Sequence, residues 1–168
     1  MIRRIAPLLL ALALAVPLTP AGAGAAELRW RSFDDGLREA RASGRPVMVD
    51  VFTDWCRWCK VMDRDVYSRA DVQDYVAKHF VPVRINAEGG RLATYAGATM
   101  SERAVATRFG INSYPTTLFL HTDGSHLVNV PGYWPPDQFL LVLRFVAEGR
   151  FERGEDFEAY LKQSGKAR

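Results

Sequence analysis

The chain has 168 residues, of which 48% are hydrophobic and 24% are charged, and its formal net charge is +3. This length fits one domain built around a single core, and we find no internal repeat or low-complexity tract. Because no dense stripe of Lys and Arg occurs, the composition argues against a nucleic-acid partner.

The first residues, 1–25, have the pattern of a secretory signal peptide. Arg3 and Arg4 precede an almost wholly apolar run, which small residues suited to a signal peptidase follow. The alternative, an uncleaved membrane anchor, is disfavoured because the apolar run falls short of the ~20 residues of a spanning helix. We predict cleavage after Ala23 or Ala25, export, a nearly neutral mature chain and no membrane span after cleavage.

The first half of the predicted domain, which covers residues 26–168, alternates helical and strand patterns. In chain order we expect a helix over 32–42, a strand over 46–53, a helix over 56–66, a helix starting near 68 and a strand over 80–87. The serine and acid at Ser68 and Asp71 have the spacing of a capping box. The strand over 46–53 is nearly continuously apolar, which is typical of a strand buried on both faces, and Asp50 alone interrupts it.

The second half begins with a glycine- and alanine-rich stretch over 88–100 that has no clear period. We interpret it as a loop or partly helical insertion. The elements expected after it are a helix over 101–109, two strands within 115–130 joined by a turn at 122–125, a helix over 136–149 and a polar tail helix over 155–162. This order predicts a single α/β sandwich with a mixed sheet.

The only two cysteines, Cys56 and Cys59, stand in a C-x-x-C motif where a strand passes into a helix. A disulfide across so short a loop constrains the unfolded chain little, so chemistry is a better reason for the pair than stability. The helix N-terminus and the cation of Arg57 both favour a thiolate on Cys56, which we predict to be the nucleophile. Cys59 is then in reach to resolve a mixed disulfide.

A buried carboxyl six residues before the first cysteine, Asp50, is predicted to accept the proton of Cys59, because burial raises its pKa. The plainer interpretation is an ion pair between Asp50 and Arg84 on the neighbouring strand. The two interpretations are compatible.

Metal and haem sites fit the sequence less well. His121 and His126 have H-x4-H spacing, but they lie far from Cys56 and Cys59 and flank a predicted turn, where exposed histidines are the simpler interpretation. Haem attachment through C-x-x-C needs a following histidine, and this chain has Lys60. We therefore expect no metal and no cofactor.

Three separated motifs together resemble the thioredoxin superfamily. "VDVFTDWCRWCK" resembles its active-site segment, "INSYPTTLFL" its cis-proline segment, and Gly132 falls where the family has a glycine after its hairpin. Within the superfamily the first motif is most similar to the C-terminal thioredoxin-like domain of the DsbD type and to small exported thioredoxins, so this chain would be that domain standing alone. The resemblance spans 47–146 and implies a three-layer sandwich, with helices flanking a central mixed β-sheet.

The resemblance also implies a substrate-binding groove beside the cysteines. A cis Pro115 would leave the backbone of Tyr114 able to bind an extended substrate segment as an added strand. Trp55, Arg57 and Trp58 would border this groove. The alternative is that one of the two tryptophans packs in the core instead, and this alternative suits Trp55 better than Trp58.

The function that follows is an exported thiol–disulfide oxidoreductase. We expect it to reduce oxidised proteins with electrons from a membrane-bound thiol donor, because a buried acid at Asp50 penalises the thiolate form. The cation of Arg57 has the opposite effect, because it stabilises the thiolate. A disulfide oxidase or isomerase is therefore the second candidate function, and a redox-inert binding module is the third. The residues between the cysteines, Arg57-Trp58, differ from the family's Gly-Pro, so the family's redox potential does not carry over to this chain. The insertion over 88–100 is longer than the family has at that point, so the family's partners do not carry over either.

Overall fold

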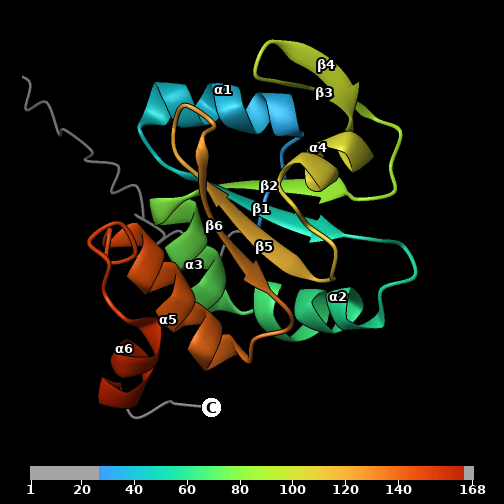
Figure 1. The fold of residues 1–168 in the computed structure, drawn as a ribbon. Helices are drawn as coiled ribbons and strands as arrows, with labels where there is room; N and C mark the ends of the chain where they lie inside the picture. The colour runs from blue at the N-terminus through green and yellow to red at the C-terminus, as the bar shows by residue number, and fades with distance from the viewer. Residues whose placement is uncertain (1–26, 165–168) are drawn as a thin grey trace, which may run out of the picture.

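The computed structural model describes residues 27–164 and confirms the predicted three-layer α/β sandwich. A central four-stranded mixed sheet lies between two layers of helices (Figure 1). The predicted signal peptide, residues 1–25, lies outside the described residues. Within residues 27–164, no helix has the length and apolar character needed to cross a membrane.

Strand β1 (Val47–Phe52) occupies an inner position in the sheet, whose order is β2-β1-β5-β6. It pairs in parallel with β2 (Val81–Asn86) and antiparallel with β5 (Thr116–Leu120), which pairs in turn with β6 (His126–Pro131). This position explains the continuous apolar run of β1, since both of its faces are covered.

The two faces of the sheet carry separate apolar clusters. On one face α1 (Phe33–Ser43) and α4 (Glu102–Arg108) pack against Val47, Val49 and Val51 of β1. On the other face, Met48 packs among side chains of α2 (Arg57–Met62), α3 (Ala70–His79) and α5 (Pro136–Ala147). Because side chains alternate along a strand, Asp50 is directed to the same face as Met48.

Helix α1 follows the sequence prediction at both ends. The Ser32 hydroxyl accepts a hydrogen bond from the Asp35 backbone N–H, and Gly44 adopts the left-handed conformation after the last turn. Its glycine, Gly36, is buried against β2, where the side chain of Val83 occupies the place that a Cβ would need.

The helical segment after the cysteines is irregular. Helix α2 (Arg57–Met62) passes into a π-helical turn, η1 (Asp63–Tyr67), and α3 (Ala70–His79) follows. The predicted capping box of Ser68 is wrong: this hydroxyl donates to the backbone carbonyl of Arg64, and the N-cap of α3 is Arg69, whose side chain makes no capping hydrogen bond. Ser68 instead closes the preceding turn.

The prediction of a loop or partly helical insertion over 88–100 is also wrong. The segment forms an antiparallel hairpin of β3 (Leu92–Tyr95) and β4 (Ala98–Ser101). The two residues of its turn, Ala96 and Gly97, both have positive φ, at 51° and 78°, which is the backbone of a tight hairpin turn. The segment lacked a recognisable period because both strands are short and largely exposed.

The remaining helices agree with the sequence prediction. Gly110 has a positive φ after α4, and α5 (Pro136–Ala147) begins at the Pro-Pro pair. The tail helix α6 (Phe157–Gln163) is less polar than expected, because Leu161 is fully buried and the ring of Phe157 lies 5.0 Å from that of Phe145 on α5.

We predict that Gly36→Ala destabilises the fold although alanine favours helices. The added Cβ would lie 2.0 Å from Cγ2 of Val83, so the helix and the sheet must separate, which should lower the free energy of unfolding by about 1–3 kcal/mol. Urea unfolding measures this quantity. Gly90→Ala is the matched control, since nothing lies within 4 Å of the position that its added Cβ would take; it should change stability by less than about 0.5 kcal/mol. Equal effects of the two variants would contradict the packing argument.

Candidate active site

The two cysteines form a disulfide at the point where β1 gives way to α2. The S–S distance between Cys56 and Cys59 is 2.07 Å and their Cα atoms lie 5.3 Å apart. Cys56 occupies the N-cap of α2, and its backbone N–H donates to the carbonyl of Thr53 at 3.1 Å. The turn after the strand therefore fixes where the disulfide sits.

The N-cap position distinguishes the two sulfur atoms. Sγ of Cys56 accepts the backbone N–H of Cys59 at 3.0 Å, and the positive end of the helix dipole favours negative charge on the same atom. Burial does not distinguish them, because Cys56 is 3% and Cys59 4% exposed. Arg57 is exposed, and its guanidinium takes part in no ion pair with another described residue.

Asp50 is buried on β1, and its predicted pairing with Arg84 is confirmed. Nε of Arg84 donates to Oδ2 of Asp50 at 2.7 Å, and the hydroxyl of Tyr67 donates to Oδ1 at 3.3 Å. The same guanidinium also pairs with Asp63, a more exposed carboxylate on η1. Burial raises the pKa of Asp50 above its ordinary value, although the charge of Arg84 opposes this effect.

The backbone beside the disulfide is set by a proline. The peptide bond between Tyr114 and Pro115 is cis, and Pro115 is buried immediately before β5. Gly132, with a φ of 83°, donates its N–H to the carbonyl of Pro115 at 2.8 Å. Within residues 27–164, neither the N–H nor the carbonyl of Tyr114 has a backbone hydrogen bond.

Both tryptophans of the motif lie on the surface, so the alternative in which one of them packs in the core does not hold for either. Trp55 is 66% and Trp58 56% exposed. The indole N–H of Trp55 donates to a carboxylate oxygen of Glu88 at 3.0 Å, and its ring contacts that of Tyr114 edge to face. The ring of Trp58 lies 5.2 Å from that of Tyr133. The structure thus brings together an aromatic surface beside the cysteines.

Four residues of this region were missed in the sequence. Tyr67 and Asp63 contact the Asp50–Arg84 pair, Glu88 binds Trp55, and Tyr133 packs on Trp58. Tyr133 directly follows Gly132, the glycine after the β5–β6 hairpin, and this position was the one sequence signal that could have placed it near the site. The others come from segments whose position depends on the irregular helix and on the inserted hairpin.

The histidines considered as metal ligands lie at the β5–β6 turn and have other partners. Nε2 of His126 lies 3.0 Å from Oδ1 of Asn129, and Nδ1 of His121 lies 3.7 Å from a carboxylate oxygen of Glu152. Across residues 27–164, no group of three or more His, Cys, Asp or Glu side chains is arranged to hold a metal ion.

Comparison with known proteins places this site in a family. Residues 33–147 match the model of the thioredoxin-like domain, and the chain belongs to that family. The family, the fold and the paired cysteines together support thiol–disulfide oxidoreductase activity.

Among curated relatives, the thiol:disulfide interchange protein DsbD of Ralstonia nicotianae is 36% identical over 112 residues, which cover 66% of this chain. DsbD of Yersinia pestis strain Pestoides F is 30% identical over 106 residues, covering 60% of this chain. The matches span 17% and 16% of those much longer proteins.

Solved structures share the fold. The solution structure of a thioredoxin from Thermus thermophilus aligns with a TM-score of 0.62 and 27% identity, covering 77% of this chain and 95% of that one. A thioredoxin-fold protein from Helicobacter pylori aligns with a TM-score of 0.65 and 22% identity, covering 72% and 84% of the two chains.

Replacing Asp50 by Asn tests the effect of its burial on stability. Because the native pKa lies above the ordinary value of 3.8, the native state binds more protons, and stability falls as the pH rises from that value through the raised pKa. We expect oxidised Asp50→Asn to lack this decline, as Arg84 keeps Asp63 as a partner. Urea unfolding between about pH 4 and pH 8 measures the difference. The exposed Asp74→Asn should keep the wild-type pH dependence, and a decline retained in Asp50→Asn would contradict the argument.

Proposed function

We propose that this protein is an exported reductase of protein disulfides that acts through Cys56 and Cys59. The observation that carries the proposal is the disulfide at the N-cap of α2, directly after a strand that holds a buried acid. The signal-peptide pattern of residues 1–25 supports export. The same pattern and the DsbD relatives support a membrane-bound thiol donor as the source of electrons.

The reaction is a pair of thiol–disulfide exchanges. The thiolate of Cys56 attacks a substrate disulfide, forms a mixed disulfide and releases the first substrate thiolate. Cys59 then loses its proton and attacks Sγ of Cys56, which releases the second substrate thiolate. Two electrons pass to the substrate, and the protein is left with the Cys56–Cys59 disulfide that the structure contains.

Asp50 is proposed as the group that accepts the proton of Cys59. Its raised pKa brings it nearer to the range in which a carboxyl exchanges protons at neutral pH. Arg84 and Tyr67 hold both of its oxygens, so its orientation is fixed. A buried acid also disfavours a second negative charge nearby, which supports the reducing direction.

The substrate-binding surface is proposed to lie along Tyr114 and Pro115. The unpaired backbone of Tyr114 supports the addition of an extended substrate segment as a strand. The exposed rings of Trp55 and Trp58 would contact apolar side chains of that segment, and Arg57 would lie at its edge. An oxidised, locally extended polypeptide is therefore the proposed substrate class.

One observation favours the alternative of an oxidase or isomerase. Arg57 is exposed and unpaired with any described carboxylate, and a cation near Cys56 stabilises the thiolate, which makes the disulfide more oxidising. A redox-inert binding module is the remaining alternative.

The redox potential decides the direction. Equilibration of the mature protein with glutathione buffers should give a value near that of thioredoxin, about −270 mV, if the protein is a reductase. A value near that of DsbA, about −120 mV, would establish the oxidase instead. Arg57→Gln should make the potential more negative, because it removes a cation that stabilises the reduced form.

Single cysteine variants test the order of the two exchanges. Cys59→Ser should accumulate mixed disulfides with its substrates through Cys56, because the resolving thiol is missing, and non-reducing electrophoresis detects them. Cys56→Ser should lose disulfide reduction and trap few partners. If Cys56→Ser instead keeps all partner contacts and restores the cellular phenotype, the binding-module alternative is correct.

A further inference from the structure

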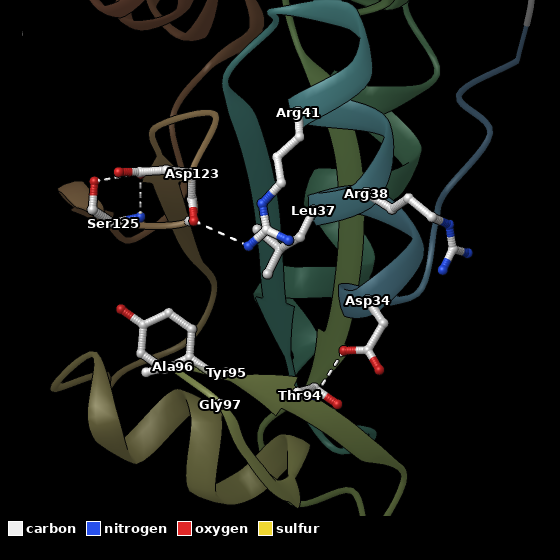
Figure 2. A pocket seen from close by; sticks show the side chains of 11 residues that line it. Asp34, Leu37, Arg38, Arg41, Thr94, Tyr95, Ala96, Gly97, Asp123 and Ser125 are labelled. Atoms are coloured by element: carbon white, nitrogen blue, oxygen red, sulfur yellow. Dashed lines mark hydrogen bonds between the residues drawn. The ribbon is translucent and has the colours of Figure 1, made fainter.

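A hollow of about 600 Å³ lies beside helix α1 (Figure 2). Strand β5 runs from the cis-proline end to the β5–β6 turn, so this turn is far from the cysteines along the sheet. Helix α1, the tip of the β3–β4 hairpin and the β5–β6 turn form the walls. None of the eleven lining residues belongs to the candidate active site.

The side chain that defines the hollow is Arg41. Figure 2 shows its side chain extending from α1 toward the β5–β6 turn, where the guanidinium donates to the backbone carbonyl of Asp123 at 3.3 Å. It forms no ion pair with any carboxylate of the described residues, whereas Arg38, one turn earlier, pairs with Asp35. Arg41 therefore keeps the capacity for a charge-assisted, two-pronged contact with an anion.

Opposite Arg41, a tyrosine offers an apolar surface and a polar tip. The ring of Tyr95 packs against those of Phe33, at 6.1 Å, and Phe109, at 4.9 Å, so its position is fixed. Its hydroxyl is directed toward the β5–β6 turn in Figure 2. The buried side chain of Leu37 supplies a second apolar surface to the hollow.

The walls are joined to one another, so the hollow exists before any ligand arrives. The backbone N–H of Thr94 donates to Oδ1 of Asp34 at 2.6 Å, which fastens the hairpin to α1. The Arg41 contact fastens α1 to the β5–β6 turn, and Gly124 of that turn packs against Leu37. A preformed cavity of this size is typical of small-ligand sites and lowers the entropy cost of binding.

The charges of the lining select the kind of anion. The lining carries two arginines, Arg38 and Arg41, and two carboxylates, Asp34 and Asp123, so it has no net charge and offers a polyanion little attraction. A single carboxylate needs only the unpaired guanidinium. We propose that this hollow binds a carboxylate attached to a short apolar body, with the carboxylate on Arg41 and the Tyr95 hydroxyl and the apolar body against the part-exposed ring of Tyr95, above the buried Leu37. A free organic acid and the C-terminal carboxyl group of a peptide share this chemistry.

The test uses two pairs of matched probes on the oxidised, ¹⁵N-labelled protein. The first pair is N-acetyl-leucine and its neutral amide, and the second is a short peptide ending in leucine with a free or an amidated C-terminus. We expect saturable shifts of the backbone amide signals of Gly97 and Gly124 with the free carboxylates and none with the amides. Tighter binding of the free acid identifies a small molecule as the ligand, and tighter binding of the peptide identifies a chain end.

Three variants make the test specific to the hollow. Arg41→Ala should weaken binding about tenfold or more, and Tyr95→Phe should weaken it less, because it loses one donor and keeps the ring. Arg29→Ala removes the same charge from an exposed site elsewhere and should bind like the wild type. Equal binding of acid and amide, equal effects of Arg41→Ala and Arg29→Ala, or no saturable shift would overturn the proposal.

Carboxylate binding at the hollow can be tested separately from disulfide reduction at the cysteines. Arg41 lies outside the candidate active site, so Arg41→Ala should reduce protein disulfides at the wild-type rate. Loss of carboxylate binding with reduction retained is the expected pair of results. If disulfide reduction is absent in the wild type, the proposed function fails, while the carboxylate titration still tests the hollow by itself.

Discussion

The structure depends on the burial of strand β1 on both faces. That burial fixes the strand between β2 and β5, and a short turn after the strand leads to Cys56, the N-cap of the next helix. It also places the carboxyl of Asp50 in an apolar layer, where its charge is costly. One apolar segment of the sequence thus determines both where the disulfide lies and which acid accompanies it.

The buried acid is stabilised by a small polar network rather than by a single partner. Arg84 joins Asp50 to the more exposed Asp63, and Tyr67 binds the other oxygen of Asp50. Truncating one member would leave a buried polar group without its partner, which usually costs more than the interaction contributes. The network therefore couples the irregular turn after α2 to the central strand.

Much of this fold could be predicted because its elements carry strong local patterns. The continuous apolar run of β1, the serine cap and left-handed Gly44 of α1, and the Pro-Pro start of α5 each have a local cause. The β3–β4 hairpin could not be predicted, because its short, exposed strands lack periodicity and its turn uses Ala96 at positive φ, where asparagine or glycine is usual.

The residues of the candidate site also fall into those that the sequence predicts and those that it does not. The cysteines and the pairing of Asp50 with Arg84 followed from spacing and from adjacent strands. The contacts of Trp55 did not, because they depend on Glu88 in the segment leading to the hairpin. An exposed indole held by a distant carboxylate is a tertiary property, and a rule that places large aromatic residues in the core gives the wrong answer there.

The near-complete burial of both cysteines has a consequence for which substrate segments could reach them. Cys56 is only 3% exposed, and the exposed indoles of Trp55 and Trp58 flank it in the sequence. Under the proposed function, this burial would favour substrate segments that can extend toward Cys56 over segments held in a rigid surface.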